Sequence, residues 1–247
     1  MAVDEAILRA LAAGRAPPTL RFYAWEPACL SLGRAQKATD IDLEALQVAG
    51  CGLVRRPTGG KAILHVDELT YSAIAPDTDP RVAGSIVESY RRLSAGLVRG
   101  LELLGVTDLS ADRRWSSRRL AGPVCFEVPS DYEITCGGCK LMGSAQMRSR
   151  GVVLQHGALP LHGDVARICR FLVSRPDSAR VRARATTVEQ ALSHPVAWDE
   201  AADALATGLA EVLNLYLEPG ALTEEELAWA EELRAEKYAT REWTRKV

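Results

Sequence analysis

Two residues in the middle of the chain, Cys125 and Lys140, have side chains that together could perform nucleophilic chemistry. Cys125 lies in the segment PVCFEVPSD and Lys140 opens the segment KLMGSAQ. A cysteine attacks through its thiolate, and a neighbouring cation lowers the pKa of the thiol. A cysteine without such a neighbour is more often an inert, packed residue. The pair is therefore a candidate catalytic site if the fold brings the two side chains together.

A second candidate is the loop RRPTGGKAILH, at 55–65, in which a glycine pair and three cations connect two apolar runs. Gly59 and Gly60 allow a ligand or another backbone to come close. The loop has neither the G-x-x-x-x-G-K-[ST] pattern of a phosphate loop nor the G-x-G-x-x-G pattern of a dinucleotide site. A hairpin turn with solvated arginines explains the same spacing and stays open as an alternative.

Two further patterns place small or titratable residues where a substrate could lie. Gly143, Ser144 and Ala145 interrupt an expected strand, and such residues are best tolerated where a ligand approaches. A bulge or a tight sheet crossing is the alternative. His156, which precedes Gly157, is either a hydrogen-bond donor to a substrate or a satisfied core histidine.

The segment CGGC, at 136–139, is a single C-x-x-C motif. Such a motif can be a redox pair or half of a zinc site, but zinc needs two more ligands and no second C-x-x-C is present. A two-residue hairpin turn on Gly137 and Gly138 is therefore expected, and no metal site is predicted.

Composition limits the classes of protein that the chain can belong to. It has 247 residues, of which 25% are charged and 47% hydrophobic, with a formal net charge of −2. These values are typical of a soluble globular protein and give no electrostatic reason to expect binding to nucleic acid or to an anionic membrane. No apolar run has the roughly 20 residues needed to cross a bilayer. With six cysteines and no export signal at the start, the expected compartment is the reducing cytoplasm.

The elements that must position these residues form an α+β pattern with a mixed, mostly antiparallel sheet flanked by helices. Apolar periodicity and turn residues predict helices at 2–14, 39–50, 80–105, 164–173, 199–214 and 223–238, and strands at 20–25, 28–33, 52–56, 61–65, 68–75, before CGGC, and twice within 140–161. Asp40 is the expected N-cap of the second helix, and Thr223 with Glu226 forms a capping box. Residues 1–247 are expected to form one domain, with a helical C-terminal part at 196–247.

The segment 174–195 is polar and rich in arginine, and it is expected to be a loop or linker. Its arginines, Arg175, Arg180, Arg182 and Arg184, could guide acidic carrier domains. A solvated loop without that role is an equally good interpretation.

The motifs, taken together, resemble a known group. RRPTGGKAILHVDELTYS, CFEVPSDYEI, KLMGSAQMR and LQHGALPL occur in the order seen in the biotin/lipoate protein ligase superfamily. The chain is most similar to the octanoyltransferases of lipoate assembly that resemble lipoate–protein ligase A. The similarity covers nearly the whole chain and is specific as a combination, whereas each motif alone is weak.

The resemblance implies the ligase catalytic-domain fold and an acyl transfer in two steps. Cys125 would carry the octanoyl group as a thioester, and Lys140 would lower the pKa of that cysteine. The resemblance also implies a set of residues that line an acyl tunnel or contact the substrate. These are Arg56, Thr58, Gly59, Gly60, Lys61, Ala62, Ile63, Leu64, His65, Gly143, Ser144, Ala145, His156, Gly157, Ala158 and Leu159.

The same resemblance implies the reaction partners. The donor would be octanoyl-acyl carrier protein, and the acceptor a lysine of a lipoyl domain, such as that of the glycine-cleavage H protein or of a 2-oxoacid dehydrogenase E2. No cofactor is expected, because a thioester already carries the energy for amide formation. An ATP-dependent lipoate–protein ligase, which would need ATP and Mg²⁺, is one alternative. An enzyme that moves octanoyl between lipoyl domains and a non-catalytic acyl-binding protein are two others.

Three positions bear on how the family pattern applies to this chain. Met1 leads directly into the first helix, where the family often has a further strand, so an edge strand is expected to be missing or the start incomplete. Val66 follows His65 where aspartate is usual, and Asp67 is a possible substitute. Lys61 stands where the ligase-type loop usually carries a third glycine, which favours the transferase.

Overall fold

The main sheet of this computed structural model, which describes residues 1–111 and 133–246, contains six strands in the order β1-β5-β9-β8-β7-β6. Each pair of neighbours is antiparallel. The strands are β1 (Thr19–Tyr23), β5 (Glu68–Pro76), β6 (Leu109–Ser110), β7 (Ile134–Cys136), β8 (Cys139–Ser149) and β9 (Val152–Pro160). The predicted α+β class with a mostly antiparallel sheet is confirmed.

A second sheet of three strands holds the arginine-rich loop. Its strands are β2 (Cys29–Leu32), β3 (Gly52–Arg55) and β4 (Ile63–His65). The central strand β2 pairs in parallel with β3 and antiparallel with β4. The loop at 56–62 therefore connects the two outer strands across β2, and the alternative of a hairpin turn there is wrong.

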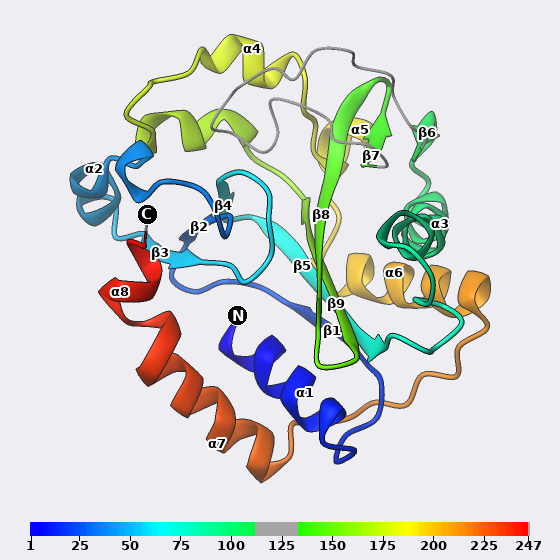
Figure 1. Cartoon of the computed structure of the whole chain (residues 1–247). Coiled ribbons are helices and arrows are strands. Elements are labelled where there is room, and N and C mark those ends of the chain that lie inside the picture. Colours follow the sequence, from blue (N-terminus) through cyan, green and yellow to red (C-terminus); the bar gives the residue numbers. More distant parts are fainter. Residues whose placement is uncertain (112–132, 247) are drawn as a thin grey trace.

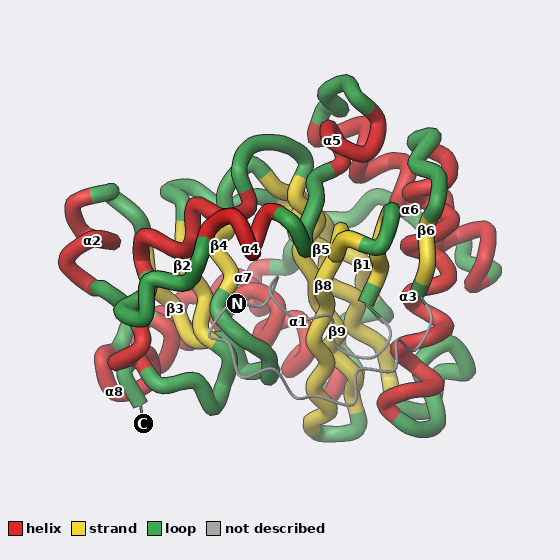
Figure 2. The backbone as a smooth tube through the Cα atoms, turned by 90° about the horizontal axis from the view of Figure 1, so that it is seen from above, coloured by secondary structure: helices red, strands yellow, loops and turns green. Residues whose placement is uncertain are grey.

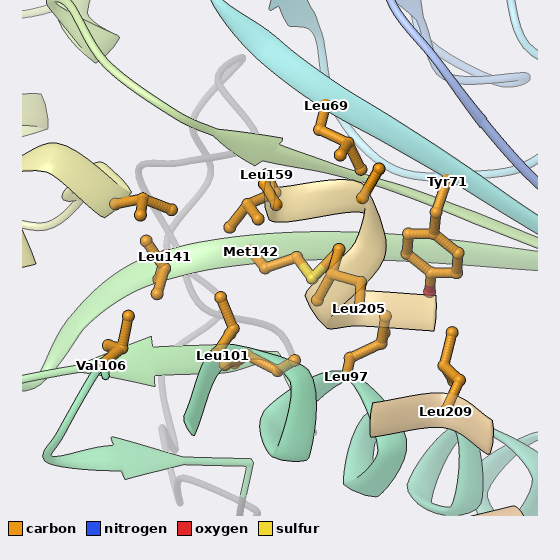
Figure 3. Packing of buried hydrophobic residues seen from close by; sticks show 14 of the residues in the cluster. Leu69, Tyr71, Leu97, Leu101, Val106, Leu141, Met142, Leu159, Leu205 and Leu209 are labelled. Atoms are coloured by element: carbon orange, nitrogen blue, oxygen red, sulfur yellow. The ribbon is translucent and has the colours of Figure 1, made fainter. Parts of the chain in front are cut away.

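Helices cover the two faces of the main sheet, as the views in Figures 1 and 2 show. On one face, α3 (Ile86–Leu103) and α6 (Trp198–Leu213) pack on the sheet through the largest apolar cluster. Leu97 and Leu101 of α3 and Leu205 of α6 meet Tyr71 and Met142 of the sheet (Figure 3). On the other face lie α1 (Ala2–Ala12), which α7 (Glu224–Leu233) backs, and the small sheet.

Three glycines allow α3 and α6 to come into backbone contact. A Cβ on Gly208 would lie 2.2 Å from the backbone nitrogen of Gly100, and a Cβ on Gly96 would lie 2.8 Å from a methyl carbon of Leu209. No larger residue fits at Gly208 unless the helices separate. This crossing holds α6 close to the sheet behind the strands that carry the site residues.

Capping residues set several helix boundaries that differ from the sequence prediction. α3 begins at Ile86, after the Ser85–Glu88 capping box, and not at residue 80. α2 (Leu43–Val48) is capped by Asp42, because Asp40 belongs to a preceding 3₁₀ turn, η1 (Ala38–Asp40). The Thr223–Glu226 capping box of α7 is confirmed, and the chain continues as a π-helical turn, η4 (Arg234–Tyr238), and then as α8 (Arg241–Thr244).

The segment from 164 to 195 differs most from its prediction. The expected helix at 164–173 is a 3₁₀ helix, η3 (Val165–Phe171). The expected linker contains two short helices, α4 (Ser178–Arg182) and α5 (Val188–Leu192). It is not a solvated loop throughout, because Val181, Ala185 and Val188 are buried in the two cores.

The C-x-x-C segment forms the predicted two-residue turn between β7 and β8. Gly137 and Gly138 have φ angles of 56° and 82°, a conformation that glycine adopts without strain. Cys136 and Cys139 face each other across the turn and are free thiols. Among the described residues, no helix is long and apolar enough to cross a membrane.

Candidate active site

The centre of the candidate site is a buried ion pair between Lys140 and Glu133. Lys140 Nζ lies 2.5 Å from Glu133 Oε1, and the two residues are 0% and 6% exposed. The two are brought together by the β7–β8 hairpin, in which Ile134 pairs with Met142 after a β-bulge. A buried ammonium group is costly unless a carboxylate compensates it, and Glu133 supplies that charge.

The backbone of Lys140 is fixed from outside the hairpin by the segment that was predicted to be a linker. Its N–H donates to the Arg184 carbonyl at 2.7 Å, and its carbonyl accepts from Thr186 N–H at 2.9 Å. Ala185, between them, forms a parallel bridge with Lys140 and is buried. The segment after α4 therefore positions the lysine.

Gly143 leaves the space that the end of the lysine side chain occupies. A Cβ on Gly143 would lie 3.0 Å from Lys140 Cε and 3.2 Å from Nζ, closer than ordinary packing allows. Gly143 also lines an apolar pocket between the two sheets. The ammonium group therefore lies beside the wall of that pocket.

The pocket brings together ten of the predicted binding residues. They are Arg56, Gly60, Ile63, His65, Gly143, Ser144, Ala145, His156, Gly157 and Ala158. Met1 and Thr70 complete the lining and were not predicted. The pocket volume is about 30 Å³, roughly the share of one water molecule, so an acyl chain can enter only if the walls move apart.

The remaining predicted binding residues do not line this pocket. Ala62 packs in the core beneath the small sheet, and Leu159 packs against α3 and α6 on the opposite face of the main sheet. Leu64 lines a different cavity, and Gly59 and Lys61 are exposed. Thr58 is buried, and its hydroxyl lies 2.7 Å from His156 Nε2. Strand alternation explains Leu64 and Leu159, because neighbouring residues point to opposite faces.

The arginines of the loop are structural and buried, so their interpretation as solvated hairpin residues is wrong. Arg56 is 3% exposed and donates to the carbonyls of Gly59 and Lys61 at 2.9 Å, which fixes the glycine loop. Arg55 is fully buried and donates to the carbonyls of Gly33 and Thr244, among others. Guanidinium groups suit this role because each offers five donors.

His65 belongs to a directional chain of hydrogen bonds. Arg56 Nη1 donates to Ser31 Oγ at 2.7 Å, Ser31 Oγ lies 2.7 Å from His65 Nε2, and His65 Nδ1 lies 2.9 Å from Glu68 Oε1. Arginine can only donate, so the Ser31 hydroxyl hydrogen is free for Nε2 and His65 donates from Nδ1 to Glu68. Both ring nitrogens are used in this way, and His65 has none left for a substrate.

His156 lies in the pocket wall next to a second buried carboxylate. Burial lowers the pKa of His156, and this outweighs the opposing effect of Asp4. His156 Nδ1 lies 3.8 Å from Asp4 Oδ2, beyond hydrogen-bond distance, and has no hydrogen-bond partner among the described residues. The histidine is therefore neutral at pH 7, with Nε2 engaged by Thr58.

Ser144 is held from the opposite face of the sheet. Gln155 Nε2 donates to the Tyr71 hydroxyl at 2.8 Å, and that hydroxyl lies 2.8 Å from Ser144 Oγ. Burial raises the pKa of Tyr71 to about 12, so the phenol stays protonated and donates to Ser144. Ser144 therefore lines the pocket from a fixed position.

One residue of the predicted site is not described by the structure, and one residue of the observed site was not predicted. Cys125 lies outside the described residues, so its position relative to Lys140 stays a prediction. Glu133 was missed, although it precedes the hairpin strand and strand alternation places it near Lys140. Among the residues that the structure describes, no group of three or more His, Cys, Asp or Glu side chains could hold a metal ion.

Comparison with known proteins identifies related sequences along almost the full chain. The model of the lipoyl protein ligase A/B catalytic domain matches residues 1–210. The octanoyltransferase LipM of Kyrpidia tusciae is 46% identical over 254 residues, which cover 98% of this chain and 92% of that protein. The octanoyltransferase LipM of Brevibacillus brevis is 43% identical with the same coverage of both chains.

Solved structures share the fold. A lipoate–protein ligase A bound with ATP superposes with a TM-score of 0.82 at 30% identity, covering 99% of this chain and 92% of that one. A bi-partite lipoate protein ligase from Thermoplasma acidophilum gives a TM-score of 0.78 at 27% identity, with 99% and 89% covered.

Proposed function

The chain belongs to the lipoyl protein ligase A/B catalytic-domain family, and we propose that it is an octanoyltransferase that works through an acyl-thioester on Cys125. Relatives with 43–46% identity over 98% of the chain are octanoyltransferases, which supports acyl transfer in protein lipoylation as the activity. The acceptor is a lipoyl-domain protein. The donor, the acceptor species and the thioester are the parts that we propose.

The proposed reaction has two steps that balance without a further reactant. The Cys125 thiolate attacks the carbonyl carbon of the donor thioester, and the bond from that carbon to the carrier sulfur breaks. The released carrier thiolate takes up a proton. The amine of the acceptor lysine then attacks the enzyme thioester, loses a proton and forms the amide, and Cys125 leaves as a thiolate.

The observation that carries the proposal is the buried Lys140–Glu133 pair beside the apolar pocket. An ammonium group held at a pocket wall favours a thiolate near it. Five of the twelve residues that line the pocket are glycine or alanine, from β8, β9 and the loop after Arg56, and such small residues suit an acyl chain. Each buried methylene of that chain contributes about 0.8 kcal/mol to binding.

We propose octanoyl-acyl carrier protein as the donor, and as acceptor the glycine-cleavage H protein or a 2-oxoacid dehydrogenase E2. No cofactor is needed, because the donor is already activated. We propose that the protein works in a reducing compartment such as the cytoplasm.

The test is an assay with labelled octanoyl-acyl carrier protein and a panel of lipoyl domains, with and without ATP. The proposed function predicts octanoylated lipoyl domain at the same rate in both conditions. Product that forms only from free lipoate and ATP, with release of pyrophosphate, would identify a ligase. Binding of octanoate without any product would identify a non-catalytic acyl-binding protein.

A further inference from the structure

Two segments that are far apart in the sequence meet at the buried guanidinium group of Arg55. It donates to the carbonyls of Gly33 and Gln36, in the turn that follows β2. It also donates to the carbonyls of Trp243 and Thr244 in α8, which packs against β3 (Figures 1 and 2). The turn after β2 and α8 are therefore neighbours on the protein surface.

The glycine loop of the apolar pocket lies against the same turn. The backbone N–H of Arg34 donates to the Thr58 carbonyl at 2.8 Å. A Cβ on Gly33 would lie 1.9 Å from the carbonyl oxygen of Gly60, so the two backbones are in direct contact. Gly60 lines the apolar pocket, and Lys61 is the next residue along the chain. The turn after β2 therefore borders the loop that forms part of the pocket wall.

The three segments, 33–37, 59–61 and 241–246, carry a group of exposed cations that we call the cationic surface. Its residues are Arg34, Lys37, Lys61, Arg241, Arg245 and Lys246. In the described part of the chain, none of the six lies within ion-pair distance of a carboxylate. The segments contain one acidic residue, Glu242, so six cations and one carboxylate give a net charge of +5, while the rest of the chain has −7. With Asp40, which follows the first segment, the net charge is still +4.

This concentration of positive charge favours an anionic partner. Like charges that share one surface repel each other, and an anionic partner replaces this repulsion by attraction. Complementary charges also steer two proteins together and raise their rate of association. The arginines of the segment 174–195 suit this role less well, because Arg175 and Arg182 form ion pairs with Asp42 and Asp164. The cationic surface is therefore the stronger candidate for docking an acidic protein next to the pocket.

We propose that the cationic surface docks the acyl donor, a carrier domain with an acidic face and a thioester arm that begins at a phosphodiester. This inference rests on the proposed function, which requires such a donor to bring its acyl group to the pocket. Guanidinium and ammonium groups form strong, charge-assisted hydrogen bonds with phosphate and carboxylate oxygens. The acceptor fits this surface poorly, because its reactive group is a lysine ammonium, which the cations repel.

The test measures binding of acyl carrier protein that has its phosphopantetheine arm but no acyl group, so that it does not depend on a thioester at Cys125. Fluorescence anisotropy of the labelled carrier gives its affinity for the full chain. Arg34→Gln/Lys246→Gln removes two charges of the cationic surface and should weaken binding at least fivefold at low ionic strength. The control Arg99→Gln/Arg150→Asn removes two exposed charges, from α3 and from the β8–β9 turn, and should stay within twofold of the wild type.

Several outcomes would overturn the inference. These are equal affinities of the test and control variants, and a wild-type affinity that does not fall as salt is added. A lipoyl domain that loses as much affinity as the carrier in the test variant would assign the surface to the acceptor. A ribo-oligonucleotide that binds more tightly than the carrier would assign it to a nucleic acid. If circular dichroism shows that the double variant is unfolded, Lys246→Gln alone decides: a twofold loss is expected, and an unchanged affinity would contradict the inference.

A second measurement separates this inference from the proposed function. Acylation of Cys125 by octanoyl-acyl carrier protein should be at least fivefold slower in Arg34→Gln/Lys246→Gln. Acylation by octanoyl-pantetheine, which has neither the phosphodiester nor the carrier domain, should keep its wild-type rate. A wild-type protein that binds the carrier through this surface and never becomes acylated would refute the thioester alone. Acylation by the carrier at the wild-type rate in the variant, or equal slowing with both donors, would refute the docking surface alone.

Discussion

Lys140 Nζ and Glu133 Oε1 lie 2.5 Å apart across the β7–β8 hairpin, and both side chains are excluded from solvent. The end of the Lys140 side chain occupies the space that Gly143 leaves at the wall of the apolar pocket, and its backbone is fixed by residues 184–186. This arrangement gives the pair a structural role, and we propose a catalytic role for Lys140; the two roles can be tested separately.

Replacement of Lys140 tests the catalytic role. Lys140→Ala should slow acylation at pH 7 about tenfold or more, because less of the Cys125 thiol is ionised without the ammonium group. The rate should recover in part as the pH rises, because hydroxide then ionises the thiol instead. The measurement is the pH profile of acyl-enzyme formation, and a profile identical to that of the wild type would remove Lys140 from the mechanism.

The free energy of unfolding tests the structural role of the pair. Glu133→Leu alone should cost about 3–5 kcal/mol, because it leaves a buried ammonium group without a counter-charge. The double variant with Lys140→Met should regain most of that loss, because two apolar side chains then fill the space. Urea denaturation of the single and double variants measures this, and simple additivity of the two changes would contradict a direct pairing.

The glycine crossing of α3 and α6 predicts a clear difference between two glycines. Gly208→Ala should destabilise the protein by about 1–3 kcal/mol or more, because the new methyl group would overlap the backbone of Gly100. Gly220→Ala, where no atom lies within 4 Å of the added carbon, should stay within about 0.5 kcal/mol of the wild type. Thermal unfolding of both variants is the measurement, and equal melting temperatures would contradict the crossing.

The buried His156 predicts a loss of stability in mild acid. Burial holds the pKa of His156 below its usual value of 6.5, so the unfolded chain takes up this proton at a higher pH than the folded protein does. Above pH 6.5 the residue contributes no pH dependence. Stability should fall as the pH drops below 6.5, down to the lowered pKa, because the unfolded state then binds more protons. His156→Gln should flatten the stability curve in that range, and an unchanged curve would contradict a neutral buried histidine.

Much of the fold could be predicted from the sequence, because local patterns determine it. Strand alternation and turn residues predicted β1 to β5 and β7 to β9, and the glycines of CGGC predicted the turn between β7 and β8. Which strands pair was not predictable in this way. The segments at 52–56 and 61–65 are close in sequence, yet both pair with β2 and not with each other. Arg56 fixes the loop between them by donating to the carbonyls of Gly59 and Lys61.

The sequence predicted the small residues that leave space for a ligand, but it did not predict which charged residues are buried. Gly143 was expected beside a ligand because it is small and Gly157 because of the family resemblance, and both line the pocket. Arg55 and Arg56 are cations that sequence patterns place on the surface, and only their many carbonyl partners allow them to be buried. The segment 174–195 has a polar composition, and three apolar residues in it are enough to anchor it against Lys140.

The central claim is that Cys125 carries the acyl group, and intact-protein mass spectrometry after incubation with octanoyl-acyl carrier protein tests it most directly. The account predicts a covalent octanoyl adduct on the wild-type protein that maps to Cys125, and no adduct on Cys125→Ser. An unmodified wild-type protein, or an adduct that survives in Cys125→Ser, would contradict it.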